Sequence, residues 1–322
     1  MNLREKLYQM FILGTSGDGY KNALKNNLGG VIFFTPDIQN ENQFRNFIKE
    51  IKQHSLTPPF LSVDQEGGRV ERTENIHNGK KYLSAKYAYE KGELFLENQT
   101  EKIAKELKYF GINLNFAPCI DVNTNPNNPI IGERSFSNNP EDVIKAEKIV
   151  SSVYIKNGII PCVKHFPGHG DASSDSHLTL PEINLSLEDM EKFHIKPFRA
   201  CAKTAKMVMV AHLHCLCFDK DVVPSSLSRN VISYLRNNLG FNGVIISDDM
   251  IMKGVSRYNS ADACEMGIRA GLNMFIYRNS DSETINIIED LVKRVEKDEE
   301  LRKNVENSFN KIMSLKSDGK II

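Results

Sequence analysis

The stretch that decides the fold is residues 159–177, which read IIPCVKHFPGHGDASSDSH. Its first five residues are apolar, as in a buried strand, and the glycines and serines further on are typical of a loop at the end of that strand. Three histidines, two aspartates and a lysine fall within residues 164–177. Acids and bases are therefore delivered together at one strand end, which is how a barrel or an open α/β sheet builds a functional site.

Short apolar runs of this kind recur along the whole chain. They lie at residues 10–14, 30–34, 60–64, 114–118, 159–166, 207–213, 244–249 and 273–277. Segments with helical periodicity separate them, as at residues 144–153. Eight strands alternating with helices predict an α/β fold of the (β/α)8 or TIM-barrel type with parallel strands. Amphipathic segments at residues 285–295 and 305–313 predict helices that close the barrel, so we expect a single catalytic domain over residues 1–322.

Length and composition fit such a barrel. At 322 residues the chain has the size of one α/β barrel, and its 40% hydrophobic content can fill a large core. Its 41 basic residues balance 41 acidic ones, so the net charge favours neither nucleic acid nor a membrane surface as a partner, and a small neutral ligand fits better. The apolar run at residues 10–13 is too short for a signal segment or a membrane span. Together with six cysteines that lack a disulfide framework, this predicts a cytoplasmic protein.

Ionisable residues follow four of the predicted strands. They lie at residues 64–72, 164–165, 212–214 and 248–249. A single polar strand end often does no more than meet water. Four such ends, each directly after buried apolar residues, favour one ring of loops that carries the chemistry at the C-terminal face of the barrel.

Several blocks of the chain resemble glycoside hydrolase family 3, in its one-domain β-N-acetylglucosaminidase branch. The sequence K-H-F-P-G-H-G at residues 164–170, followed by D-S-H at residues 175–177, is similar to the signature of that branch. The other matching blocks lie at residues 29–34, 63–70, 115–122, 132–136 and 247–250. The resemblance implies a retaining exo-β-N-acetylglucosaminidase that releases terminal N-acetylglucosamine, most often from cytoplasmic muropeptide fragments in peptidoglycan recycling.

The resemblance also implies roles for individual residues. Retention requires a nucleophile on one face of the anomeric carbon and a proton donor on the other. By similarity Asp248 is the nucleophile, and His177, oriented by Asp175 on the same loop, acts first as acid and then as base. The residues implied to bind the sugar are Asp64, which accepts from hydroxyls, and Arg72, Arg134, Lys164 and His165, which donate to them. No metal and no cofactor are implied.

Two features of the sequence admit a second interpretation. The adjacent carboxylates Asp248 and Asp249 are compatible with a mechanism in which the acetamido group of the substrate attacks. Side chains alternate along a strand, so only one of the two should reach the barrel axis, and the family pattern selects Asp248. Asp249 is then a supporting or helix-capping carboxylate. Residues 212–217, HLHCLC, suggest zinc, but alternation would put the histidines and the cysteines on opposite faces, so we favour structural cysteines.

Three further functions remain open at this point. The first is a β-glucosidase or β-xylosidase of the same family, which the loop at residues 175–177 disfavours. The second is a phosphorylase activity on N-acetylglucosaminides, because a histidine base repels an incoming phosphate less than a carboxylate does. The third is a barrel that binds sugar without catalysis, which the presence of both Asp248 and His177 disfavours.

Overall fold

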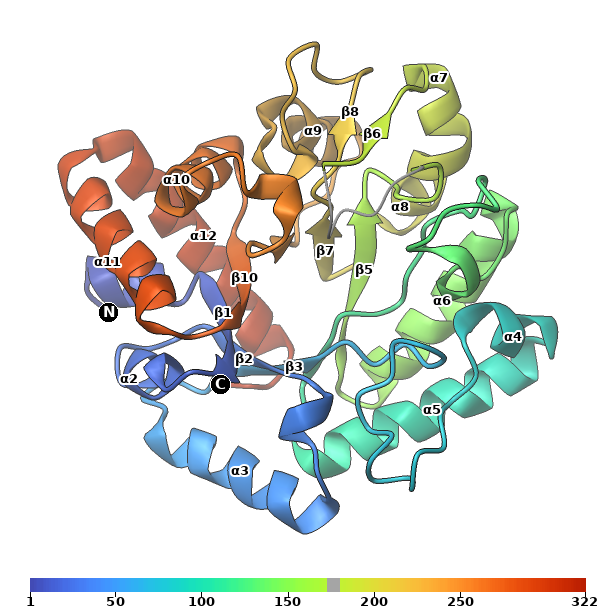
Figure 1. Cartoon of the computed structure of the whole chain (residues 1–322), viewed down its shortest axis with the longest axis horizontal. Helices are drawn as coiled ribbons and strands as arrows, with labels where there is room; N and C mark the ends of the chain where they lie inside the picture. The colour runs from blue at the N-terminus through green and yellow to red at the C-terminus, as the bar shows by residue number, and fades with distance from the viewer. Residues whose placement is uncertain (173–179) are drawn as a thin grey trace.

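The computed structural model describes residues 1–172 and 180–322. Eight parallel strands form a closed barrel with the order β1-β10-β9-β7-β5-β4-β3-β2, and helices surround it (Figure 1). The strands are β1 Phe11–Ser16, β2 Gly30–Phe33, β3 Phe60–Val63, β4 Leu114–Asn115, β5 Ile160–Phe166, β7 Met207–Val210, β9 Val244–Asp249 and β10 Met274–Asn279. Each of the eight predicted runs overlaps one of these strands, so the predicted (β/α)8 barrel is confirmed.

The helices lie between the strands and after the last of them. They are α1 Leu3–Tyr8, α2 Gly19–Leu24, α3 Glu41–His54, α4 Ala85–Glu90, α5 Glu93–Phe110, α6 Pro140–Lys156, α7 Leu187–Asp189, α8 Ile195–Cys201, α9 Arg229–Ser233, α10 Ser260–Ala270, α11 Ser282–Lys297 and α12 Glu299–Asp318. Short 3-10 or π turns are η1 Thr35–Asp37, η2 Gly132–Arg134, η3 Met190–His194, η4 Ser225–Leu227, η5 Tyr234–Asn238 and η6 Lys253–Val255. The two predicted closing helices are α11 and α12, which lie beside α1 and so bring the two ends of the chain together (Figure 1).

The sequence explains why these elements form where they do. In α3 the apolar residues Phe44, Ile48 and Ile51 recur at helical spacing and are all buried, while the side chain of Asn40 accepts from the backbone N–H of Gln43 and caps the first turn. The barrel strands are buried on both faces near their starts, as the uniformly buried strand β3 illustrates. Each large apolar side chain removed from water stabilises the fold by roughly 1.5–3 kcal/mol. The core therefore fixes the strand ends, and with them the loops that follow.

One predicted strand is too long. The run at residues 207–213 ends as a barrel strand at Val210, and His214–Cys215 forms a separate strand, β8, which pairs with β6, Glu182–Ile183. The chain leaves the barrel after Val210, so residues 212–217 do not form one strand, and of these residues His214 and Cys215 alone share β8. The alternation that we used to separate them does not apply.

The membrane prediction can be examined on the described residues alone. Within residues 1–172 and 180–322, no helix combines the length and the apolar character needed to cross a bilayer.

Candidate active site

A cavity of about 340 Å³ lies at the C-terminal ends of the barrel strands. Six of the residues predicted for the site line it, namely Asp64, Arg72, Arg134, Lys164, His165 and Asp248. They come from the end of β3, the loops after β3 and β4, the end of β5 and the end of β9. The predicted acid/base pair, Asp175 and His177, lies outside the described residues. The barrel therefore brings residues as far apart in the sequence as Asp64 and Asp248, 184 positions, to the same cavity.

The floor of this cavity is a buried network of charges. Lys164 Nζ lies 2.8 Å from Asp64 Oδ1 and 2.6 Å from Glu66 Oε1, and the Lys164 side chain is only 2% exposed. Arg134 makes a bidentate pair with Glu66, with distances of 2.9 Å from Nε and 2.8 Å from Nη2. Burying a single ammonium group is costly, and here two carboxylates offset that cost. The network leaves Asp64, which is 19% exposed, facing the cavity as an acceptor for a hydroxyl group.

The charges of the floor are fixed by their mutual attraction. Burial opposes ionisation of Glu66, but the cations of Arg134 and Lys164 outweigh it and hold the pKa of that carboxyl below its usual range. Burial likewise opposes the charged form of Lys164, and the carboxylates of Asp64 and Glu66 outweigh it and raise the pKa of the ammonium. The cavity therefore offers a fixed set of donors and an acceptor to a neutral ligand such as a sugar.

Asp121 positions the histidine that lines the cavity. Its buried carboxylate accepts from the backbone N–H groups of His165 at 3.1 Å and His169 at 2.6 Å, and its Oδ2 lies 2.6 Å from His165 Nδ1. Burial opposes ionisation of Asp121, but His165 and His169 outweigh it and hold the pKa of this carboxyl below its usual range. An ionised carboxylate can only accept, so the proton of the imidazole lies on Nδ1.

This tautomer bears on the role of His165. Arg134 Nη2 lies 3.3 Å from His165 Nε2, which in a neutral imidazole is the acceptor nitrogen. With the proton on Nδ1, Nε2 faces the guanidinium of Arg134, and donation from His165 to a sugar hydroxyl stays a prediction. Burial, and after it the nearby His165, lower the pKa of the neighbouring His169 to about 4.

Cys119, Asp121 and His165 form a compact group of metal-ligand type. One ligand atom from each lies within 4.8 Å of the others, and all three residues are buried. Cys119 Sγ donates to Asp121 Oδ2 at 3.3 Å, and burial raises the pKa of this thiol well above its usual value. We assign the group to positioning His165, because Cys119 donates to Asp121 and Asp121 in turn holds the imidazole. That the protein uses no metal stays a prediction.

Asp248 and Asp249 end strand β9 and differ in their surroundings. Burial raises the pKa of Asp248, but His165, His212, the backbone N–H of Asp249 and Lys164 outweigh it, so the pKa is lowered and the carboxylate is charged. For Asp249, burial dominates and raises the pKa. Asp248 is thus the better placed of the two to act as a nucleophile.

Asp249 is bound into the barrel wall by both of its oxygens. Oδ1 accepts from the backbone N–H of Ile251 at 3.1 Å and of Arg278 at 3.2 Å, and Oδ2 lies 2.5 Å from Arg278 Nε. These bonds agree with the interpretation of Asp249 as a supporting carboxylate. Both carboxylates nonetheless border the cavity, contrary to strict alternation, because the register between β9 and β10 shifts between Met274 and Ile276, the partner of Asp249.

The two histidines of the suspected zinc cluster have other partners. His212 Nδ1 lies 2.7 Å from Ser226 Oγ, and its Nε2 lies 3.2 Å from the carbonyl oxygen of Asp249. His214 Nδ1 lies 3.4 Å from the carbonyl oxygen of Val223. His212 therefore supports the end of β9, and His214, the first residue of β8, contacts the loop that follows that strand.

Three residues of the cavity and its surroundings were not among the predicted site residues. They are Glu66 in the floor, Asp121 beneath His165, and Arg278, which lines the cavity from β10. A signal existed for Asp121, because it follows the apolar run at residues 114–120 in the way that Asp64 follows β3. Arg278 follows the last strand in the same way.

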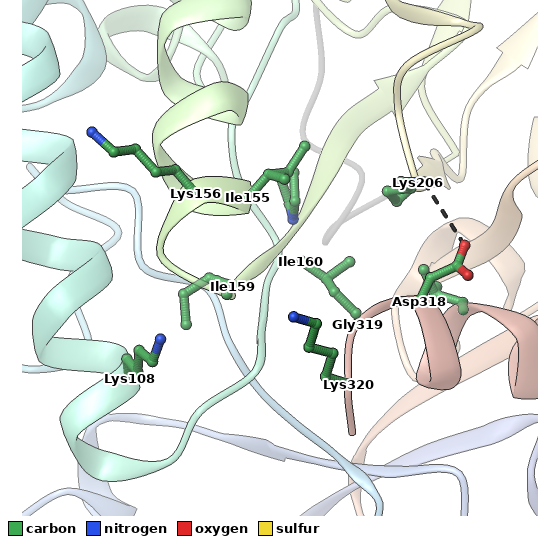
Figure 2. Close-up of a pocket in the computed structure, with 12 residues that line it drawn as sticks. Lys108, Ile155, Lys156, Ile159, Ile160, Lys206, Asp318, Gly319 and Lys320 are labelled. Atoms are coloured by element: carbon green, nitrogen blue, oxygen red, sulfur yellow. Dashed lines mark ion pairs between the residues drawn. The ribbon is translucent and has the colours of Figure 1, made fainter. Parts of the chain in front are cut away.

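A second hollow, of about 270 Å³, lies at the opposite end of β5 (Figure 2). Its lining includes Lys108, Ile160, Lys206, Asp318 and Lys320. Among these described lining residues the one carboxylate, Asp318, lies 3.8 Å from Lys206 Nζ, as the dashed line in Figure 2 marks. Glycoside hydrolysis requires a nucleophile and a proton donor on opposite sides of the bond, so the cavity at the C-terminal end of the strands is the better candidate.

The comparison with protein families decides what this arrangement is. The model of the glycosyl hydrolase family 3 N-terminal domain matches residues 2–315. The chain belongs to glycosyl hydrolase family 3. This confirms the family that residues 164–177 suggested, and with it the assignment to the glycoside hydrolases.

Individual proteins also resemble the chain over most of its length. Beta-hexosaminidase A of Pseudoalteromonas piscicida is 35% identical over 77% of this chain and 45% of that protein. A beta-hexosaminidase of Tolumonas auensis is 32% identical over 82% of this chain and 79% of its own length. The structure of a family 3 beta-N-acetylglucosaminidase from Paenibacillus sp. superposes with a TM-score of 0.92 at 27% identity, over 100% of this chain and 63% of that one. The chain thus spans less than two thirds of the first and third of these proteins.

Proposed function

We propose that the protein is a retaining exo-β-N-acetylglucosaminidase that removes terminal N-acetylglucosamine from β-linked oligosaccharides. The observation that carries the proposal is the ionised carboxylate of Asp248 beside a cavity whose floor is the network of Asp64, Glu66, Arg134 and Lys164. A cavity that is closed at one end by buried charges fits the terminal sugar of an oligosaccharide better than an internal sugar. The names of the relatives, beta-hexosaminidase and beta-N-acetylglucosaminidase, support the same activity.

The proposed reaction has two steps. In the first, an oxygen of Asp248 forms a bond to C1 of the sugar as the bond from C1 to the leaving-group oxygen breaks, and His177 gives its proton to that oxygen. In the second, His177 takes a proton from water, the water oxygen bonds to C1, and Asp248 leaves as a carboxylate. Two inversions at C1 give net retention. Asp175 would hold the imidazole of His177 in the tautomer that these transfers require.

The experiment that tests this function is turnover of aryl β-glycosides of N-acetylglucosamine, glucose and xylose, with NMR of the first product anomer. We expect hydrolysis of the N-acetylglucosaminide with β-anomer formed first, and a kcat/KM for the other two sugars lower by about 100-fold or more. Release of glucose or xylose at a comparable rate would support the β-glucosidase or β-xylosidase alternative. First formation of the α-anomer would contradict the retaining mechanism.

The acid/base role of His177 has its own test. A proton donor matters most for a poor leaving group, because a good one departs without protonation. We expect His177→Ala to lower kcat/KM by about 100-fold for a disaccharide and by about tenfold or less for a 2,4-dinitrophenyl glycoside. Equal losses on both substrates would mean that His177 is not the acid. Asp175→Asn should show the same ordering with smaller losses.

The natural substrate and location belong to this proposal as well. We propose muropeptide-type fragments as substrates, within a single catalytic domain over residues 1–322. A cytoplasmic location stays a prediction, and fractionation of the native host with an antibody against the protein would test it.

A further inference from the structure

Arg278 lies at the end of β10 and lines the active-site cavity, and the mechanism above does not use it. Its side chain is 44% exposed, whereas the side chains of Lys164 and Arg134 in the floor are 2% and 11% exposed. Exposure therefore increases from the floor to the wall at β10. Arg278 is a cation at the open side of the cavity.

The guanidinium group of Arg278 is held in one orientation. Its Nε lies 2.5 Å from Asp249 Oδ2, and its backbone N–H donates to the other oxygen of the same carboxylate at 3.2 Å. In the described part of the chain, Asp249 is the partner of this guanidinium, and Nε makes that contact. The edge formed by the two terminal nitrogens is left for a ligand. Such an edge matches the two oxygens of a carboxylate.

The position of Arg278 relative to the bond that breaks follows from the same contacts. Its partner Asp249 directly follows Asp248, and the backbone N–H of Asp249 donates to Asp248 Oδ1 at 2.7 Å. In the proposed function the terminal sugar occupies the closed end, next to Asp64 and Lys164, with its C1 at Asp248. Whatever is attached to C1 must then leave toward the open side. Arg278 stands on that side of the nucleophile.

We propose that Arg278 is a specificity-determining residue that binds an anionic group, such as a carboxylate, on the leaving group of the substrate. The inference rests on the proposed function and adds the chemical class of the leaving group to it. Asp249 is itself held by the backbone N–H groups of Ile251 and Arg278, so it does not depend on the guanidinium alone. The guanidinium can therefore approach a second anion without releasing the first.

The test compares two fluorogenic N-acetyl-β-glucosaminides, one with the neutral 4-methylumbelliferyl leaving group and one with the anionic 3-carboxyumbelliferyl group. The measured quantity is the ratio of kcat/KM for the anionic substrate to kcat/KM for the neutral one. In Arg278→Gln we expect this ratio to fall about tenfold, and in Arg278→Lys to fall less, because the charge remains without the planar fork. Raising NaCl from about 50 to about 500 mM should lower the ratio of the wild type but not that of Arg278→Gln.

A matched control is available on the same face of the barrel. Arg257 is exposed, lies over the ring of Tyr258 and is not among the residues that line the cavity. Arg257→Gln removes the same charge from the surface and should keep the wild-type ratio. This variant separates a contact at the cavity from a general change in surface potential.

The outcomes are distinguishable. If the wild type hydrolyses both substrates and Arg278→Gln loses activity on both equally, Arg278 acts only through Asp249 and the inference is wrong. If Arg257→Gln changes the ratio as much as Arg278→Gln does, the effect is not local and the inference is also wrong. If the wild type hydrolyses neither substrate, the proposed function itself fails, and the inference fails with it.

Discussion

Asp248→Asn should lower kcat/KM for an aryl N-acetyl-β-glucosaminide by about 1,000-fold or more, equivalent to about 4 kcal/mol of transition-state stabilisation. The amide has nearly the shape of the carboxylate but lacks the charge that attacks C1 and stabilises the developing positive charge on the sugar. The surroundings of Asp248 lower its pKa, so the wild-type carboxylate is charged at neutral pH. Steady-state kinetics with purified wild type and variant gives the ratio.

A covalent label identifies the nucleophile independently. A 2-fluoro glycosyl reagent should leave a sugar adduct on the peptide that contains Asp248, and fragmentation in the mass spectrometer can separate Asp248 from Asp249. The matched variant is Asp249→Asn, for which we expect a smaller loss, because Asp249 is bound to Arg278 and to backbone N–H groups rather than to the sugar. Full activity in Asp248→Asn, or an adduct on Asp249, would refute the assignment.

Lys164→Met is expected to damage both stability and catalysis. The ammonium of Lys164 is the buried partner of Asp64 and Glu66, at 2.8 and 2.6 Å. Removing one member of a buried ion network leaves uncompensated charge and typically costs about 3–5 kcal/mol. We expect a loss of unfolding free energy of that order in urea denaturation, and a fall of about 100-fold or more in kcat/KM, because the floor no longer positions the sugar.

Two further variants separate the causes of this effect. Asp64→Asn in the Lys164→Met background removes the carboxylate that has lost its near partner, so it should restore part of the stability without restoring activity. Lys105→Met breaks a surface pair with Glu101 at a side chain that is 67% exposed, and should change the unfolding free energy by less than about 1 kcal/mol. A Lys164→Met protein as stable as Lys105→Met would contradict the account of the floor.

The barrel could be predicted because each strand has its own local sequence pattern. Runs such as residues 30–34 and 244–249 are apolar and rich in β-branched residues, and strands such as β3 are buried along their whole length. The end of β7 could not be predicted from the run at residues 207–213, because it depends on pairing. His214 finds a partner in Glu182, which lies 32 positions earlier, and leaves the barrel. The local sequence pattern does not show whether a segment pairs within the barrel or with β6.

The candidate site could be predicted where a charged residue directly follows a strand, as with Asp64 and Asp248. Site residues were missed where a loop places a side chain inside the protein. Glu66 is buried because Arg134, 68 positions away, reaches back to pair with it, and Asp121 is buried because it accepts from His169, 48 positions away. Both contacts are products of the fold. No spacing in the sequence distinguishes Glu66 from an exposed carboxylate, whereas the apolar run before Asp121 gave a signal for that residue.

The glycine pair in the loop after β3 is a case in which the local argument was sufficient. Two adjacent glycines are typical of a tight turn with positive φ, and the φ angles of Gly67 and Gly68 are 94° and 62°. A side chain on Gly67 would lie 2.3 Å from the carbonyl oxygen of Leu83. The turn places Glu66 and Arg72 at the two ends of one loop beside the cavity.

Resistance to acidification is a consequence of the buried carboxylates around the cavity. A carboxyl group whose pKa is lowered by folding adds stability above its ordinary pKa, and this stability is lost only as the pH falls toward the lowered value. Glu66, Asp121 and Asp248 all belong to this class. At about pH 5 the carboxylates of Glu66, Asp121 and Asp248 therefore remain charged. Acidification should therefore leave these three carboxylates charged at a pH at which carboxyl groups with ordinary pKa values begin to bind protons.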